Sequence, residues 1–198
     1  MDFKDVVAGR RMVRHFADEP VDRSVLERIA AVAQRAPSAG FSQGQRLLIV
    51  TEPAARRRIA ELSFEPYMVE QGYDRWLSEC AAIFVPLVSE QVYHRRYQEP
   101  DKLEPGGEEI DWPVPYWWMD IGCTVMLVLL AAVDEGLAAG FAGAEADGIA
   151  AFKREFGVPD EFLPVGFIPV GRPLPDKRSP SLARGWVPTQ EFARWERW

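Results

Sequence analysis

The feature that most constrains this chain is an almost uninterrupted apolar segment from Ile121 to Val133, flanked by Asp120 and Asp134. The segment is shorter than the roughly 20 residues that a membrane-spanning helix needs. A helix that is apolar on all sides has to be surrounded by protein. In a chain of 198 residues, a second subunit would most easily cover one side of it. We therefore expect a central helix at a homodimer interface and no association with a membrane.

The composition indicates one acidic, globular domain over residues 1–198. Hydrophobic residues make up 47% and charged residues 27% of the chain, which is typical of soluble proteins. The net charge of −7 disfavours general binding to nucleic acid. Two cysteines, Cys80 and Cys123, and two histidines are too few for a disulfide scaffold or a multi-histidine metal centre. We read both cysteines as buried small apolar residues, expect no metal, and expect a cytoplasmic location because the N-terminus is too polar for a signal peptide.

Positive charge is concentrated near the two ends of the chain. Arg10, Arg11 and Arg14 stand close together, and bases outnumber acids in residues 172–198, whereas residues 99–111 carry most of the excess acid. Arginine side chains fit the oxygens of a phosphate-like anion both geometrically and electrostatically. The two clusters therefore suggest a site for a discrete anion, although scattered surface arginines would give the same pattern.

Periodicity and turn residues predict alternating helices and strands. A capping box at Ser24 and Glu27 is expected to open a helix that Pro37 ends. The other expected helices cover residues 2–8, 53–62, 89–97 and 145–156, with a less regular helical stretch toward Glu79. The expected strands cover residues 47–51, 81–88, 137–142 and 162–170.

A proline-rich and acidic loop over residues 100–115 is long for a plain connection, which favours a lid over about residues 99–118. Trp112, Tyr116 and Trp117 lie at its exit. Aromatic rings gathered in this way could cover a flat ligand, and packing in the core is the alternative.

Common catalytic and nucleotide-binding motifs are absent or poorly placed. The chain has no G-x-G-x-x-G fingerprint and no phosphate-binding loop of the G-x-x-x-x-G-K-[ST] type. Residues 40–44 match the G-x-S-x-G motif of serine hydrolases around Ser42. That motif needs a strand before the serine and a helix after it, and the expected order here is the reverse.

Five segments, taken in order, resemble the FMN-dependent nitroreductase family, and each corresponds to a family motif. They are Gly9–Phe16 with Pro20-Val21 (R-R-S-x-R-x-F, then P-V), Ala36–Gln43 (A-P-S-x-x-N-x-Q), Asp120 with the apolar helix and Glu135–Leu137, Gly157–Pro159 followed by Pro169–Pro173 (P-V-G-Y-P), and Ser181–Gly185. The resemblance implies an α+β fold with three layers, α/β/α, around a mixed, mainly antiparallel central sheet. It also implies an intertwined homodimer that binds FMN at its interface, with a C-terminal arm over about residues 172–198.

The resemblance also assigns cofactor-binding roles. Arg10, Arg14 and Arg184 would hold the FMN phosphate, and Arg11 and Met12 would contact the flavin through their backbone. Residues on the other walls of the site would be Pro37, Ser38, Gln43, Phe141, Ala142, Gly143 and Ala144. No side chain is expected to act as a catalytic acid or base, because the flavin performs the chemistry.

The implied reaction is hydride transfer from NADH or NADPH to an electrophilic acceptor, such as a nitroaromatic or a quinone, by a ping-pong mechanism. Reductive dehalogenation and flavin fragmentation are alternatives on the same fold, as is a flavin- or deazaflavin-binding module without turnover. The chain departs from the family pattern at Met12, Phe41, Gly44-Gln45 and Arg172. These departures leave the acceptor and the choice of donor open.

Overall fold

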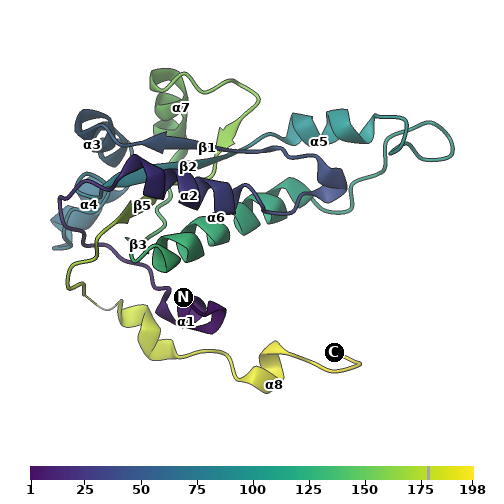
Figure 1. Cartoon of the computed structure of the whole chain (residues 1–198). Helices are drawn as coiled ribbons and strands as arrows, with labels where there is room; N and C mark the ends of the chain where they lie inside the picture. The colour runs from purple at the N-terminus through teal and green to yellow at the C-terminus, as the bar shows by residue number, and fades with distance from the viewer. Residues whose placement is uncertain (178) are drawn as a thin grey trace.

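A central antiparallel sheet organises the molecule (Figure 1), which a computed structural model describes over residues 1–177 and 179–198. Across the sheet, the strands are β1 (Gln45–Val50), β2 (Ala82–Val88), β5 (Ile168–Gly171) and β3 (Ala138–Ala139), with β4 (Leu163–Pro164) beside the end of β2. An isolated parallel bridge joins Met12 to Ala139 at the β3 edge. The expected mixed, mainly antiparallel sheet is confirmed.

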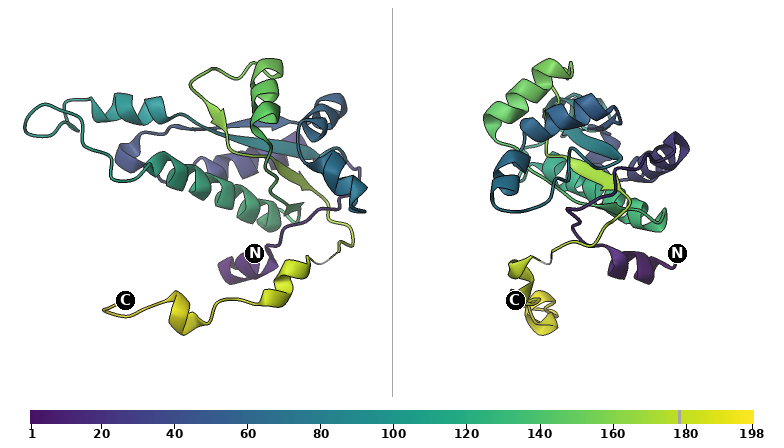
Figure 2. Two further views of the ribbon diagram at one scale, coloured as in Figure 1. Left: turned by 180° about the vertical axis from the view of Figure 1, so that it is seen from behind. Right: turned by 90° about the vertical axis from the view of Figure 1, so that its left-hand side faces the viewer.

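Helices cover both faces of the sheet, as the two turned views show (Figure 2). They are α1 (Phe3–Gly9), α2 (Arg23–Ala33), α3 (Pro53–Glu61), α4 (Glu65–Glu70), α5 (Glu90–Tyr97), α6 (Tyr116–Asp134), α7 (Ala146–Glu155) and α8 (Thr189–Phe192). All of β2 is buried, and successive side chains of a strand face opposite sides. Ile83 and Val85 pack into the core with α3 and α7, whereas Ala82 and Phe84 pack with α2 and α6. This alternation produces the three expected layers.

Helix α6 is the long apolar helix, and it is longer than the sequence predicted. It packs against α2 and the sheet. On the side that faces away from them, which we call the open side of α6, Met119 and Met126 are 60% and 44% exposed. By length and composition alone it could cross a membrane, so the prediction that it is too short to do so was wrong. Its packing against α2 and the sheet is that of a core helix.

Three local predictions need correction. Helix α2 begins at Arg23 with Asp22 as its N-cap, so Ser24 lies inside the first turn and forms no capping box. Asp22 is itself a favoured N-cap residue and immediately precedes the helix. The strand expected over residues 162–170, with interruptions at Pro164 and Pro169, divides into β4 and β5. The break lies after Pro164, where Gly166 has φ 151°, whereas Pro169 is part of β5. The strand expected over residues 137–142 is reduced to β3.

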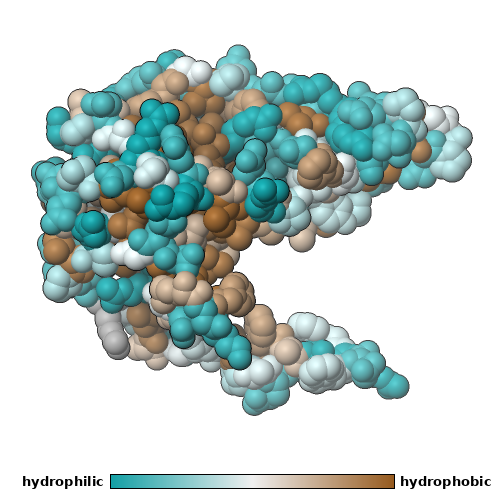
Figure 3. Space-filling view, in the orientation of Figure 1, coloured by the Kyte–Doolittle hydropathy of each residue, from teal (hydrophilic) through white to brown (hydrophobic). Residues whose placement is uncertain are grey.

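The C-terminal arm leaves the body after the antiparallel bridge between Phe16 and Pro173. It contains the 3-10 helix η2 (Pro180–Arg184) and α8, and every residue from 180 to 198 is exposed. A space-filling view shows a deep recess between the arm and the body (Figure 3). Trp186, Trp195 and Trp198 on the arm are at least 86% exposed. The arm therefore has almost no core of its own.

Candidate functional site

The N-terminal segment places three arginines at the β3 edge of the sheet. Val13 donates its backbone N–H to the carbonyl of Ala139 at 3.1 Å, which holds the segment in place. The guanidinium groups of Arg10, Arg11 and Arg14, which we call the arginine patch, pair with no carboxylate within residues 1–177 and 179–198, although Asp176 accepts the backbone N–H of Arg14 at 2.7 Å. The guanidinium groups of the patch are therefore not engaged in ion pairs.

The arginine patch lies close to a turn with free backbone donors. Ala142 and Phe167 exchange two backbone hydrogen bonds of 2.8 Å. After this pair, the N–H groups of Gly143 and Ala144 have no acceptor in the described part of the chain. A Cβ at Gly143 would meet nothing nearer than a ring carbon of Phe64 at 3.9 Å, so a ligand could approach this backbone. The predicted segments 10–14 and 141–144 thus adjoin through β3.

The predicted segment from Pro37 to Gln43, which we call the η1 loop, has an unusual backbone. It contains the 3-10 helix η1 (Ala39–Phe41), and Phe41 and Gln43 have positive φ angles of 55° and 53°. Such conformations cost energy for residues with side chains and often occur at functional sites. The hydroxyl of Ser38 accepts the N–H of Gln43 at 2.9 Å, and Phe41 remains 74% exposed.

A buried carboxylate anchors the η1 loop. Asp120 on α6 accepts the N–H of Ala39 at 2.9 Å and the hydroxyl of Tyr93 at 2.8 Å. Burial and the neighbouring Asp120 raise the pKa of Tyr93, so its hydroxyl stays protonated as the donor. The loop is therefore fixed to the N-terminal part of α6.

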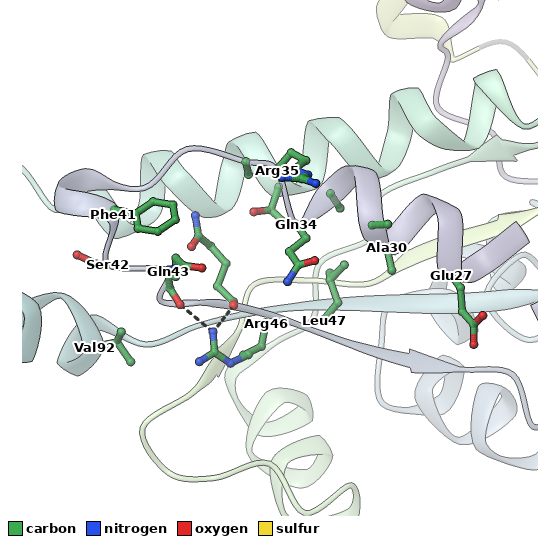
Figure 4. A pocket seen from close by; sticks show the side chains of 15 residues that line it. Glu27, Ala30, Gln34, Arg35, Phe41, Ser42, Gln43, Arg46, Leu47 and Val92 are labelled. Carbon is green, nitrogen blue, oxygen red and sulfur yellow. Dashed lines mark hydrogen bonds between the residues drawn. The ribbon is translucent and has the colours of Figure 1, made fainter. Parts of the chain in front are cut away.

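A cavity of about 1040 Å³ opens beside the η1 loop, between α2 and β1 (Figure 4). Gln34, Arg35, Phe41, Gln43 and Arg46 are among its lining residues. Figure 4 shows the Arg46 guanidinium hydrogen-bonded to the carbonyls of Gln43 and Gln45, both at 2.7 Å. Of the predicted cofactor residues, only Gln43 lines this cavity, and no motif in the sequence pointed to Gln34 or Arg46.

One chain does not bring the predicted cofactor residues together. The η1 loop lies at the N-terminal part of α6, and β3 follows the other end of this helix (Figure 1). From Asp120 to Asp134, the helix extends by roughly 20 Å at 1.5 Å per residue. Arg184 lies on the exposed arm, and its side chain makes no hydrogen bond or ion pair with the described residues. The predicted set therefore forms two separate regions plus Arg184.

The predicted lid aromatics do gather, against α5. The rings of Tyr97 and Trp112 have centroids 4.5 Å apart, and Trp117 is 8% exposed in a core cluster with Tyr93. Tyr116 lies at the edge of the group, with its ring centroid 6.1 Å from that of Trp112. Trp117 is thus a core residue, whereas the loop before Trp112 extends beyond the end of α5 (Figure 1). The role of these rings toward a ligand stays a prediction.

Acidic residues of the lid are used in internal contacts. Glu109 accepts hydrogen bonds from Trp112, Gln98 and His94. Partial burial opposes ionisation of Glu109, but these donors hold the pKa of its carboxyl below the ordinary value. The hydrogen bond to Glu109 is the main cause that raises the pKa of His94, and Glu90 adds to it. The lid is therefore tied to α5 by a charged contact.

The cysteines differ from each other. Cys80 is buried, as expected, and burial raises the pKa of its thiol to about 12. Cys123 is exposed on the open side of α6, so the prediction that it is buried was wrong for the single chain. No group of three or more histidine, cysteine, aspartate or glutamate residues could hold a metal ion in the described ranges.

A family model decides the classification. The model described as "Nitroreductase family" matches residues 7–172, which include the arginine patch, the η1 loop and residues 141–144. The chain belongs to the Nitroreductase family. The match ends at Arg172, where the C-terminal arm begins.

Relatives of this nitroreductase family member are distant in sequence and similar in fold. An NADPH-dependent oxidoreductase of Staphylococcus aureus is 22% identical over 182 residues, which cover 91% of this chain and 68% of the relative. A nitroreductase family protein of Streptococcus pneumoniae superposes with a TM-score of 0.75 at 18% identity, over 98% of this chain and 100% of that one. A protein of Exiguobacterium sibiricum, solved in complex with FMN, gives a TM-score of 0.75 at 18% identity over 99% and 98%.

Proposed function

We propose that this chain is an FMN-dependent oxidoreductase that uses NADH or NADPH to reduce an electrophilic acceptor, such as a nitroaromatic or a quinone. Membership of the Nitroreductase family supports the reaction class. The names of the Staphylococcus aureus and Exiguobacterium sibiricum relatives support NADPH and FMN. The observation that carries the proposal is the arginine patch, whose guanidinium groups form no ion pair in the described chain, joined through β3 to a turn with free backbone N–H groups.

The residues present fit the chemistry of FMN. Its phosphate carries close to two negative charges, which the guanidinium groups of Arg10 and Arg14 can pair without first breaking an ion pair in the described chain. The N–H groups of Gly143 and Ala144 are free donors in an open position, suited to the polar edge of a flavin ring. Arg11 and Met12 would contribute backbone contacts between these two groups.

A second copy of the chain would complete the site. The η1 loop and the arginine patch lie at opposite ends of α6, and the side of α6 between them exposes Met119, Cys123 and Met126. A two-fold axis across this side would place the η1 loop of one subunit beside the arginine patch of the other. Pro37, Ser38 and Gln43 would then face FMN from the partner. We therefore include a homodimer in the proposal.

The C-terminal arm fits the same assembly. Its three large tryptophans are exposed in the single chain, and exposed apolar surface of this extent usually marks an interface. The recess between arm and body could receive the second subunit (Figure 3). The arm would bring Arg184 toward a phosphate that Arg10 and Arg14 already contact. We propose this as its role in cofactor binding.

Bound FMN supplies the hydride chemistry, so the protein has to orient the cofactor and stabilise charge. The backbone donors at Gly143 and Ala144 would stabilise negative charge that develops next to them, because preorganised dipoles need no rearrangement. Trp112 and Tyr116 at the lid exit would restrict the entry of water. No side-chain acid or base is required by this arrangement.

An absorbance spectrum and a donor titration test the proposal. We expect the purified protein to be yellow, or to bind added FMN, and its flavin absorbance to bleach under anaerobic addition of NADH or NADPH. Addition of a nitroaromatic or a quinone should restore the colour. A colourless protein that takes up no FMN would contradict the proposal. Bleaching without any acceptor turnover would favour a flavin-binding module without catalysis.

A further inference from the structure

We propose that Trp76 is a positioning residue for the FMN phosphate, because its buried ring holds the Arg14 guanidinium in place and Glu65 fixes the backbone that carries the ring. This inference rests on the proposed function, in which Arg14 binds the phosphate. Trp76 lies in the irregular segment between α4 and β2, for which the sequence predicted no functional residue.

Trp76 lies beneath the crossing of the N-terminal segment and the end of β3. It is 4% exposed, and the centre of the Arg14 guanidinium lies 5.4 Å from the ring centroid. Gly140, directly after β3, packs closely against both elements. A Cβ added there would lie 3.3 Å from the indole of Trp76 and 2.5 Å from the carbonyl oxygen of Val13. The ring therefore supports both the segment that carries Arg14 and the strand that leads to the free N–H groups.

An aromatic ring suits an arginine that has to keep its charge for a ligand. A carboxylate partner would neutralise the guanidinium and occupy its donors, whereas a ring face attracts the cation and leaves its N–H groups available. Arg14 has no carboxylate partner among the described residues, although its backbone N–H donates to Asp176 at 2.7 Å. The backbone and the guanidinium are thus fixed by different groups, and the guanidinium stays free to bind an anion.

Glu65 fixes the position of Trp76 through the main chain. It is 3% exposed, and its Oε1 accepts the backbone N–H groups of Trp76 at 2.6 Å, Leu77 at 2.7 Å and Ser78 at 3.2 Å. The indole N–H of Trp76 has no acceptor within the described ranges. Backbone anchoring and packing therefore set the orientation of the ring, since its own polar atom does not.

The preference for FMN over riboflavin isolates this role, because the two ligands differ by the phosphate. We expect Trp76→Leu to weaken FMN binding by roughly threefold to tenfold, in line with a partly desolvated cation–π contact, and to leave riboflavin binding near its wild-type value. Trp76→Phe should keep most of the preference, because it retains a ring and the lost indole N–H has no partner. Equilibrium titrations with both ligands give the ratio directly.

Matched variants separate positioning from folding. Phe152→Leu removes an aromatic ring from the same core cluster, so it should lower thermal stability and leave the FMN-to-riboflavin preference unchanged. Trp76→Met introduces a longer and more flexible side chain than leucine, which adapts better to an irregular gap without offering a ring face, and it serves if Trp76→Leu does not fold. A wild-type preference in a folded Trp76→Leu or Trp76→Met protein would overturn the inference.

Arg14→Ala distinguishes the two proposals. If it abolishes the preference while the folded Trp76 variants keep it, the inference on Trp76 fails and the phosphate site stands. If Arg14→Ala also leaves the preference at the wild-type value, the assignment of the phosphate to Arg14 fails, and the role of Trp76 fails with it.

Discussion

The carboxylate of Asp120 accepts the backbone N–H of Ala39 at 2.9 Å, and this contact joins the η1 loop to α6 across 81 positions of sequence. The same oxygen accepts the hydroxyl of Tyr93. One buried acid therefore organises the loop, the helix and the aromatic cluster below the lid.

Removal of this carboxylate should destabilise the protein. Asp120→Ala leaves the buried Tyr93 hydroxyl and the partly buried N–H of Ala39 without an acceptor, and an unsatisfied buried donor costs about 1–3 kcal/mol. We expect the free energy of unfolding, measured by urea titration, to fall by about 2–4 kcal/mol. Tyr93→Phe removes the hydroxyl and leaves the bond to Ala39 intact, so its loss should be about 1 kcal/mol. Equal losses in the two variants would show that the loop contact contributes little.

The arginine patch should determine the affinity for FMN. Charge-assisted hydrogen bonds to phosphate are stronger than neutral ones, so Arg10→Ala and Arg14→Ala should each weaken FMN binding roughly tenfold to a hundredfold. Arg23→Ala is the control, because Arg23 is an exposed arginine that pairs with Glu27 on α2. Flavin fluorescence titration measures the dissociation constants. Unchanged affinity in both patch variants would remove the basis of the proposed site.

Charge on the open side of α6 should separate the subunits. Met126 is 44% exposed in the single chain and would be covered in the proposed dimer. Met126→Glu should therefore convert the dimer to a monomer in sedimentation experiments and reduce FMN uptake with it, because each site needs both subunits. Leu163→Glu alters a residue of similar exposure, 39%, on β4 and should leave both properties unchanged. A monomeric wild-type protein that binds FMN fully would refute the two-subunit site.

The sequence predicted the layers of the fold better than it predicted the arrangement of the site. Leu26, Ile29 and Ala33 recur at helical spacing and are buried in α2, and the apolar run of β2 is fully buried. Periodicity reports which side of an element is covered, so it works for these elements. It could not show that Cys123 faces outward, because α6 is apolar on every side and its pattern marks no exposed face.

The sequence indicated which residues belong to the site, but it did not predict where they lie relative to one another. Arginines in the motif at residues 10–14 indicate an anion site from the sequence alone. Nothing in the sequence shows that the η1 loop contacts the N-terminal part of α6, far from the arginine patch. The contact is a partly buried hydrogen bond between Ala39 and Asp120, which are distant in the sequence. Trp76 was missed for a related reason, since it lies in an irregular segment where burial follows no period.

The charged contact between His94 and Glu109 should make the lid sensitive to pH. The pKa of His94 is raised above its ordinary value of 6.5, so the stabilisation is complete below pH 6.5 and is lost as the pH rises through the higher folded value. The pKa of Glu109 is lowered from 4.5, so its contribution is present above pH 4.5 and is lost as the pH falls through the lower folded value. The lid should therefore be held most firmly between about pH 4.5 and 6.5.

Tryptophan fluorescence can follow this change, because Trp112 donates to Glu109 and packs against His94. We expect a reversible change in emission as the pH rises above 6.5 in the wild-type protein, and its absence in His94→Gln, which cannot be protonated in this range. The effect should be small, because the His94 side chain is 36% exposed and solvent weakens its ion pairs. His15→Gln is the matched control, since His15 contacts Pro175 and Asp74 away from the lid. A transition that persists in His94→Gln and disappears in His15→Gln would place the pH response at the N-terminal segment instead.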